Sequence, residues 1–325
     1  MNKENDLKAL EVQKKVFALT MPGREVNSFF APKETARSLI DGGILYVNDI
    51  KYSDEYPNSF LDIWYTNENI KEKRPTFIHI HGGGNLFGDK VAGDPLAKEV
   101  KGDLSYYKDL ARRGYNVVSI NYCFAPDYRA PAQIIQVNCL FAYLIANAEK
   151  LGLDMNNVIL GGGSAGANYT AIYGLALCDK EYAKKLGFVP AIKKEAIKAL
   201  VIDEMCLTSS AILTSPNMII LTSVWLGTTE GIGKCELSLL LDVTENIKAD
   251  YIPSYITASN VEKQFEMSAS PLKEKLTAIG VDNEMYYVPK AESEELTHGF
   301  MANFSANKYS KECYEKMLAF IGKYL

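Results

Sequence analysis

Residues 158–166 read Val-Ile-Leu-Gly-Gly-Gly-Ser-Ala-Gly, and this stretch decides how the chain folds. The apolar run at 158–160 predicts a buried strand, and a helical pattern begins at Gly166. Ser164 therefore lies in G-x-S-x-G between a strand and a helix, the arrangement called a nucleophile elbow. A serine attacks only when a tight turn exposes it and a base takes its proton. Gly162 and Gly166 occupy the two positions where a side chain would crowd that turn.

The same residues allow a second interpretation. Gly161, Gly163 and Gly166 also read as G-x-G-x-x-G, a fingerprint of dinucleotide-binding loops. That fingerprint needs an acidic residue at the end of the next strand, about 20 residues on. Asp179 and Glu181 are near this spacing, but they lie in a polar segment of helical character. We therefore favour the elbow.

A second glycine motif, His81-Gly82-Gly83-Gly84, follows the predicted strand 76–80. Attack on an ester carbonyl creates an oxyanion, and preorganised backbone N–H groups stabilise it. Glycines let the backbone approach such an oxygen closely. We expect the N–H groups of Gly82, Gly83 and Ala165 to form the oxyanion hole.

The chain has three histidines. His79 lies inside a predicted strand, where a structural role is expected, and His81 opens the glycine loop. His298 is left as the general base. It follows the last predicted strand and precedes a C-terminal helix, so the nucleophile comes first in the chain and the histidine last. That order is typical of α/β hydrolases.

Strands and helices alternate from about residue 76 onward, which predicts an α/β fold with a mostly parallel sheet covered by helices on both faces. Residues 44–65 predict two further strands in an antiparallel edge hairpin. The other predicted strands are 76–80, 117–120, 158–160, 199–202, 254–257 and 284–288. The predicted helices are 97–113, 132–149, 166–178, 271–279 and 309–324.

Two segments do not fit the alternation, namely residues 1–40 and 205–249. The second contains an apolar patch from Met218 to Leu226. Within one domain over residues 1–325, we expect both segments to form a cap over the active site, since α/β sheets bind ligands beyond the carboxyl ends of their strands. Extra core or a homodimer surface are the alternatives.

Composition excludes several classes of function. Net charge is −5 and basic residues are not clustered, so we expect no nucleic-acid partner. The N-terminus has no signal-peptide pattern, and no apolar run is long enough for a membrane span, which predicts a cytoplasmic protein. The cysteines are scattered without C-x-x-C, as expected for reduced thiols: Cys123, Cys139, Cys178, Cys206, Cys235 and Cys313.

Over about residues 60–325 the chain resembles the hormone-sensitive-lipase-like esterases of the α/β-hydrolase fold. Besides HGGG, GGSAG and the final H-G-F, residues 121–132 (NYCFAPDYRAPA) resemble the family's Y-R-L-A-P-E-x-x-F-P-A segment. The resemblance implies a Ser-His-acid carboxylesterase for short acyl esters, a cap built from the N-terminus and an insertion, and no metal or organic cofactor.

The chain departs from this family at several positions. Cys123 and Phe124 replace an Arg-Leu pair, and Gly163 replaces an acidic residue. After strand 254–257 the family's aspartate position holds Val261. Glu262 is one residue further, and its longer side chain can absorb that shift, so we predict it to be the acid of the triad. Glu266 is the next candidate, whereas Glu292, Glu294 and Glu295 lie on the same loop as His298.

The sequence therefore predicts a serine esterase with Ser164 as nucleophile, His298 as base and Glu262 as acid, acting on a small-molecule ester. Two alternatives remain open. The displaced acid would suit a non-catalytic binding protein on a hydrolase scaffold, and the same machinery would suit an amidase or peptidase.

Overall fold

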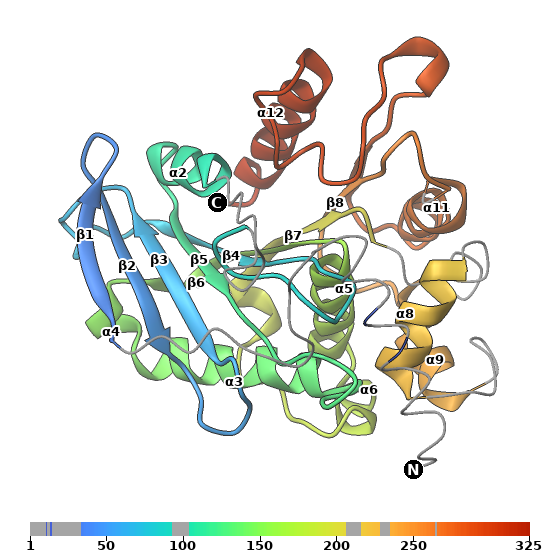
Figure 1. Ribbon diagram of the computed structural model, residues 1–325, viewed down its shortest axis with the longest axis horizontal. Helices are drawn as coiled ribbons and strands as arrows, with labels where there is room; N and C mark the ends of the chain where they lie inside the picture. The colour runs from blue at the N-terminus through green and yellow to red at the C-terminus, as the bar shows by residue number, and fades with distance from the viewer. Residues whose placement is uncertain are drawn as a thin grey trace.

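The computed structural model describes residues 11 and 14, 34–92, 104–205, 216–227, 235–263 and 265–325. Its described strands form one sheet in the order β1-β2-β3-β5-β4-β6-β7-β8-β9 (Figure 1). Along this order, β1, β2 and β3 are antiparallel to their neighbours. The pairs formed by β5, β4, β6, β7, β8 and β9 are parallel. The strands are β1 (Ala36–Ile40), β2 (Ile44–Lys51), β3 (Phe60–Tyr65), β4 (Pro75–Ile80), β5 (Asn116–Ile120), β6 (Asp154–Gly163), β7 (Ile197–Asp203), β8 (Ser254–Thr257) and β9 (Asn283–Tyr286).

Helices cover both faces of this sheet, and the central strands are accordingly apolar on both sides. On β4, Phe77 packs in one core with α2 and α12, whereas Ile78 packs in the other with α3 and α5. The helices are α2 (Ser105–Arg112), α3 (Ala132–Ala146), α4 (Ala148–Leu151), α5 (Ala165–Cys178), α6 (Lys180–Lys185), α8 (Pro216–Leu226), α9 (Glu236–Leu241), α10 (Val243–Asn246), α11 (Ser270–Ala278) and α12 (Lys308–Gly322). Short helical turns occupy Lys194–Ala196, Phe265–Ala269 and Lys290–Glu292.

The predicted fold class is confirmed, and each predicted strand overlaps an observed one. The hairpin predicted in 44–65 is β2 and β3, but β1 pairs with β2 and forms the sheet edge in its place. None of the described helices has the length and apolarity of a membrane span.

Much of the predicted cap lies outside the described residues, including 15–33, 206–215 and 228–234. Residues 36–40 of its first segment are β1, part of the sheet. In its second segment, α8 packs on the main domain, where Trp225 Nε1 donates to Gln133 Oε1 (2.8 Å) and the Trp225 carbonyl accepts the Ala130 N–H (2.9 Å).

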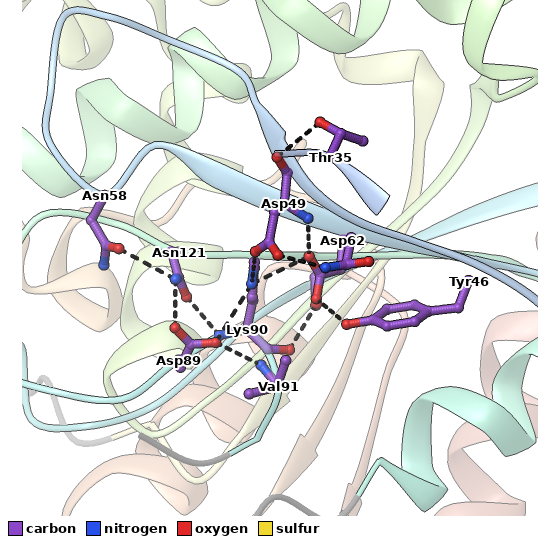
Figure 2. A network of polar contacts seen from close by, with 11 residues as sticks. Thr35, Tyr46, Asp49, Asn58, Asp62, Asp89, Lys90, Val91 and Asn121 are labelled. Carbon is purple, nitrogen blue, oxygen red and sulfur yellow. Dashed lines mark hydrogen bonds and ion pairs between the residues drawn. The ribbon is translucent and has the colours of Figure 1, made fainter. Parts of the chain in front are cut away.

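A buried charge cluster joins the residues after the HGGG loop to the antiparallel side of the sheet (Figure 2). The Lys90 ammonium is 3% exposed and lies 2.8 Å from Asp49, 3.3 Å from Asp62 and 3.8 Å from Asp89. Burial disfavours a charged lysine, but these carboxylates outweigh it and raise the pKa of Lys90 above its usual range. We call Asp49, Asp62, Asp89 and Lys90 the Lys90 cluster.

Neutral groups complete the Lys90 cluster. Tyr46 O–H (2.6 Å) and the Asp49 N–H (2.7 Å) both donate to Asp62, and Asn121 Nδ2 donates to Asp89 (2.7 Å). Even so, burial raises the pKa of Asp62 to about 6. The cluster therefore depends on Lys90, because its positive charge offsets the buried carboxyl groups of Asp62 and Asp89 and the partly buried carboxyl group of Asp49.

We predict that Lys90→Met lowers the free energy of unfolding by about 3–5 kcal/mol, since it leaves buried carboxylates without their counter-charge. Urea unfolding followed by circular dichroism measures the loss. Lys51→Met is the matched control: Lys51 and Asp54 form an ion pair with side chains 55% and 90% exposed, and such pairs contribute about 0–1 kcal/mol. Equal effects of the two substitutions would contradict the structural role of Lys90.

Candidate active site

Ser164 lies on a strained turn between a strand and a helix. β6 ends at Gly163 and α5 begins at Ala165, so a single residue reverses the chain direction. Its backbone angles are φ 53° and ψ −115°, a conformation rarely adopted by residues other than glycine. Strain of this kind persists only when the surroundings impose it, and it is concentrated at functional sites. The turn has the geometry that the G-x-S-x-G motif predicts.

Two glycines make that turn possible. A Cβ on Gly162 would lie 2.4 Å from the Gly166 carbonyl group, and a Cβ on Gly166 would lie 2.0 Å from the Ile80 oxygen at the end of β4. Both contacts are with backbone atoms, which cannot rotate away. The elbow is therefore built against the last residue of the neighbouring strand, where the HGGG motif begins.

The HGGG loop lies directly beside the serine. A Cβ on Gly82 would come within 3.1 Å of the Ser164 Cβ, so the Gly82 backbone passes next to the predicted nucleophile. Gly83 has φ +115°, and its carbonyl accepts the Leu86 N–H at 3.0 Å in a tight turn. A side chain on Gly83 would collide with the Phe87 carbonyl at 1.9 Å. The loop is thus held in a conformation that only glycines allow.

The segment that resembles the family's Y-R-L-A-P stretch supports this loop. Tyr122 O–H donates to the Gly82 carbonyl (2.8 Å), and its ring stacks on His81 with centroids 4.3 Å apart. The Ala125 N–H donates to the Asn85 carbonyl (2.9 Å). From α5, Tyr169 O–H donates to Asn85 Oδ1 (2.5 Å). These bonds fix both ends of the glycine loop.

The other side of the loop meets α8. A Cβ on Gly84 would lie 3.2 Å from Leu221 Cδ1, so this helix of the predicted cap covers the third glycine of the motif.

The three histidines occupy different environments. His79 Nδ1 lies 2.8 Å from the Tyr107 hydroxyl, and burial lowers the pKa of His79 to about 3. His81 is 5% exposed, and its Nδ1 lies 2.6 Å from the Gly82 carbonyl oxygen. His298 lies on the loop between β9 and α12, at the same end of the sheet as Glu204 of the β7 end.

Two carboxyl groups meet one nitrogen of His298. Its Nδ1 lies 3.1 Å from Glu204 Oε2 and 3.2 Å from Glu262 Oε2. Glu204 follows the last residue of β7 and its side chain is 1% exposed, whereas the side chain of Glu262 is 41% exposed in the loop after β8. Glu204 Oε2 also accepts the Gly299 N–H at 2.5 Å.

The charges around His298 alter its proton affinity. Burial alone would lower the pKa of His298, but the carboxyl groups of Glu262, Glu204 and Asp203 outweigh it and raise that pKa to about 9. Burial and the neighbouring Asp203 raise the pKa of Glu204 to about 8. Thr257 donates a hydrogen bond to Asp203, yet burial still raises the pKa of that carboxyl.

A chain of contacts connects Ser164 to this acidic group. The Ser164 N–H donates to the Asp203 carbonyl at 2.8 Å, and Asp203 is paired with Gly163 in the parallel ladder of β6 and β7. Glu204 is the next residue and contacts His298. Ser164 and His298 are therefore both attached to the carboxyl end of β7.

Among the candidates from the sequence, Glu262 is brought to His298, and Val261 is exposed. Glu266 lies in the helical turn 265–269, and Glu295 pairs with Lys290. Sequence reasoning missed Glu204. Its signal was available, because Asp203 and Glu204 directly follow a predicted buried strand and would lie at the carboxyl edge of a parallel sheet.

The structure does not support the alternative of a dinucleotide-binding loop, because the acidic residues considered for it do not lie at the end of a strand. Asp179 caps the start of α6 and accepts the N–H groups of Glu181 and Tyr182 at 3.0 and 3.1 Å. It is not at the end of a strand, and the next strand, β7, ends in Asp203, well beyond the spacing of about 20 residues that the fingerprint needs.

The sheet order, the helices on both faces and the elbow after a central parallel strand define the α/β-hydrolase fold. Comparison with known families gives the assignment: residues 61–271 match the BD-FAE family, and the chain belongs to it. The predicted resemblance to α/β-hydrolase esterases is thereby confirmed.

Individual relatives carry esterase names. Esterase LipC of Mycobacterium tuberculosis is 30% identical over 137 residues, which are 42% of this chain and 32% of LipC. The match thus spans about a third of that relative. Esterase B of Lactobacillus rhamnosis has the same fold, with a TM-score of 0.75 and 18% identity over 98% of this chain and 96% of its own. The form of esterase B inhibited with a C4-C4 tributyrin phosphonate has a TM-score of 0.73 and 19% identity, over 99% of this chain and 96% of its own.

We predict that Gly166→Ala disrupts the elbow, because the added Cβ would lie 2.0 Å from the Ile80 carbonyl oxygen. Overpacking of this kind costs about 1–3 kcal/mol or more of stability. Gly322→Ala in α12 is the matched control, since its Cβ would have no neighbour within 4 Å, and it should be neutral or stabilising by up to about 1 kcal/mol. Thermal and urea unfolding compare the two variants, and equal stabilities would contradict the steric constraint.

Proposed function

We propose that this protein is a serine carboxylesterase that hydrolyses short-chain acyl esters through an acyl-enzyme. The observation that carries the proposal is the placement of Ser164: a strained, glycine-enclosed turn presents it beside the HGGG backbone. β7, whose last residue accepts the Ser164 N–H, is followed directly by Glu204, whose carboxyl group contacts His298. Family membership and the esterase names of the relatives support the same reaction.

In the proposed mechanism His298 is the general base. Its Nδ1 faces Glu204 and Glu262, and we propose that Nε2 takes the proton of the Ser164 hydroxyl. Ser164 Oγ then attacks the ester carbonyl carbon, and the imidazolium that forms is stabilised by the carboxylates at Nδ1. Glu262 supplies one of these carboxylates, as the sequence predicts.

The negative charge of the tetrahedral intermediate needs donors that are already in place. The N–H groups of Gly82, Gly83 and Ala165 are proposed for this role, because Gly82 passes beside Ser164 and Ala165 begins α5. The start of a helix adds the positive end of its dipole. Removing one such donor in other serine hydrolases costs about 2.7–4 kcal/mol, so the fixed conformation of this loop is central to the proposal.

Collapse of the intermediate releases the alcohol, which takes its proton from His298. Water activated by the same histidine then attacks the acyl-enzyme and regenerates Ser164. The contacts at Nδ1 favour this enzyme over the alternative of a binding protein, since an acid partner for the histidine is present.

A short acyl group is proposed on two grounds. Leu221 of α8 lies against Gly84, so apolar material covers the loop beside the nucleophile. The esterase B structure also includes a form inhibited by a tributyrin phosphonate. We propose that α8 belongs to a cap built from residues 205–249 together with the N-terminal segment.

Replacement of Ser164 by alanine should remove nearly all hydrolysis of p-nitrophenyl butyrate, with a loss of several orders of magnitude. Wild-type protein should also take up a fluorophosphonate on Ser164, which mass spectrometry of peptides can locate. Ser38→Ala is a control because it changes an exposed serine in the edge strand β1. Full activity of purified Ser164→Ala would contradict the assignment.

The ester hydrolysis rate should rise with pH through the ionisation of His298. Carboxyl groups raise the pKa of His298 to about 9, so the neutral base forms only above the usual histidine midpoint of about 6.5. We expect kcat/KM to fall as pH decreases through a midpoint above 7. A rate profile over pH 5–10 measures it, and a midpoint at or below 6.5 would show that the carboxylates do not act on the base.

Among p-nitrophenyl esters from acetyl to palmitoyl, we expect kcat/KM to peak at acyl chains of two to six carbons, the order of size of the butyrate in tributyrin. Detergent-solubilised substrates at concentrations below KM provide the comparison. A rate that rises to palmitoyl would exclude the short-chain proposal while leaving the serine mechanism intact.

A further inference from the structure

We infer that Glu204, and not Glu262, is the carboxyl group on which the orientation of His298 chiefly depends. Glu204 is then a positioning residue that acts through the imidazole. This inference rests on the proposed function, and it moves the principal acid from the loop after β8 to the end of β7.

The first support is the number of attachments. Glu204 Oε2 lies 3.1 Å from His298 Nδ1 and accepts the N–H of the next residue, Gly299, at 2.5 Å. One oxygen therefore holds both the ring and the backbone of the loop that carries it. Gly299 has φ +81°, so this loop turns in a left-handed conformation at the point where Glu204 binds it.

The second support is burial. The side chain of Glu204 is 1% exposed and that of Glu262 is 41% exposed. An exposed ion pair contributes about 0–1 kcal/mol because water competes for both partners. A buried, charge-assisted hydrogen bond acts in a lower dielectric and holds its geometry. At nearly equal distances, the buried carboxyl therefore orients the ring more strongly.

The third support is rigidity. Glu204 directly follows β7, in the interior of the sheet order, and the preceding residue binds the Ser164 N–H. Its own φ is +60°, a left-handed conformation that costs energy for a residue other than glycine. Glu262 lies in the loop between β8 and the turn at 265–269. The strand that binds the Ser164 N–H also fixes the Glu204 carboxyl group. That carboxyl group therefore holds His298 at a constant position relative to Ser164.

The carboxyl groups that face His298 determine how its pKa should respond to substitution. Asp203 and Glu204 approach from the end of β7, and Glu262 approaches from the loop after β8. Each favours the imidazolium. The hydrogen bond of Glu262 also raises this pKa, but the buried Glu204 is screened less by water than the exposed Glu262. Its removal should therefore lower the pKa of His298 more than removal of Glu262.

The test compares Glu204→Ala with Glu262→Ala in the full-length protein, using p-nitrophenyl butyrate and counting active sites by fluorophosphonate labelling. We expect Glu204→Ala to lower kcat per labelled site by about 10²–10⁴-fold with little change in KM, as for loss of a triad acid. Glu262→Ala should cost about 10-fold or less. Glu204→Gln keeps an acceptor for the Gly299 N–H without the charge, so it should retain more activity than Glu204→Ala and serves if the alanine variant does not fold.

Each possible result either supports or overturns the inference that His298 depends chiefly on Glu204. A larger loss for the Glu204 variant supports the inference, and an equal or larger loss for the Glu262 variant overturns it. A purely structural role would reduce the number of labelled sites and leave kcat per site and the pH midpoint unchanged, which also overturns it.

A second readout does not need activity. The chain contains three histidines, so NMR of histidine-labelled protein can follow each titration, with His298→Gln assigning the signal. Glu204→Ala should lower the pKa of His298 by about one unit or more, and by more than Glu262→Ala does. If wild type neither reacts with the fluorophosphonate nor hydrolyses the ester, the proposed function fails, and this comparison alone decides the inference about Glu204.

Discussion

The contact between the end of β4 and the turn after β6 is the constraint on which the site depends. Gly166 leaves room for the Ile80 carbonyl only because it has no side chain, and Gly82, two residues further along from Ile80, passes beside the Ser164 Cβ. Two neighbouring parallel strands thereby bring Ser164, the proposed nucleophile, and the proposed oxyanion donors together. Because the contact involves backbone atoms, which cannot rotate away, it fixes the position of the turn relative to the end of β4. A preorganised site requires such fixed positions.

A third strand extends this arrangement. β7 pairs with β6, its last residue accepts the Ser164 N–H, and Glu204 follows at once. The carboxyl ends of β4, β6 and β7 thus supply different parts of one site, as expected at the edge of a parallel sheet. The Lys90 cluster fixes the chain that follows the glycine loop, since Lys90 pairs with Asp49 of β2 and Asp62 of β3. Buried interactions therefore hold both the glycine loop and the chain that continues from it.

Much of this could be predicted from the sequence, and the exceptions have physical reasons. The central strands were predictable because burial on both faces makes them continuously apolar, as in 158–160. β1 was missed because residues 36–39 are exposed and carry no alternating pattern; pairing with β2 makes them a strand. Ser164 and the glycines were predictable because sterics allow few residues there. Glu204 follows a predicted buried strand, which places it at the carboxyl edge of the sheet, but the sequence does not show that this strand end, as well as the loop after β8, faces His298.

The chemistry of the site follows from carboxyl groups kept close to one imidazole. In the resting protein Asp203 and Glu204 are buried side by side, and burial raises the pKa of both. That arrangement is unfavourable for folding, and Thr257 and the Gly299 N–H offset it only in part. In the proposed mechanism, transfer of the Ser164 proton to His298 places a positive charge beside the same groups, which stabilise it. Carboxyl groups that are unfavourable for folding thus assist the proton transfer that would make the Ser164 hydroxyl nucleophilic.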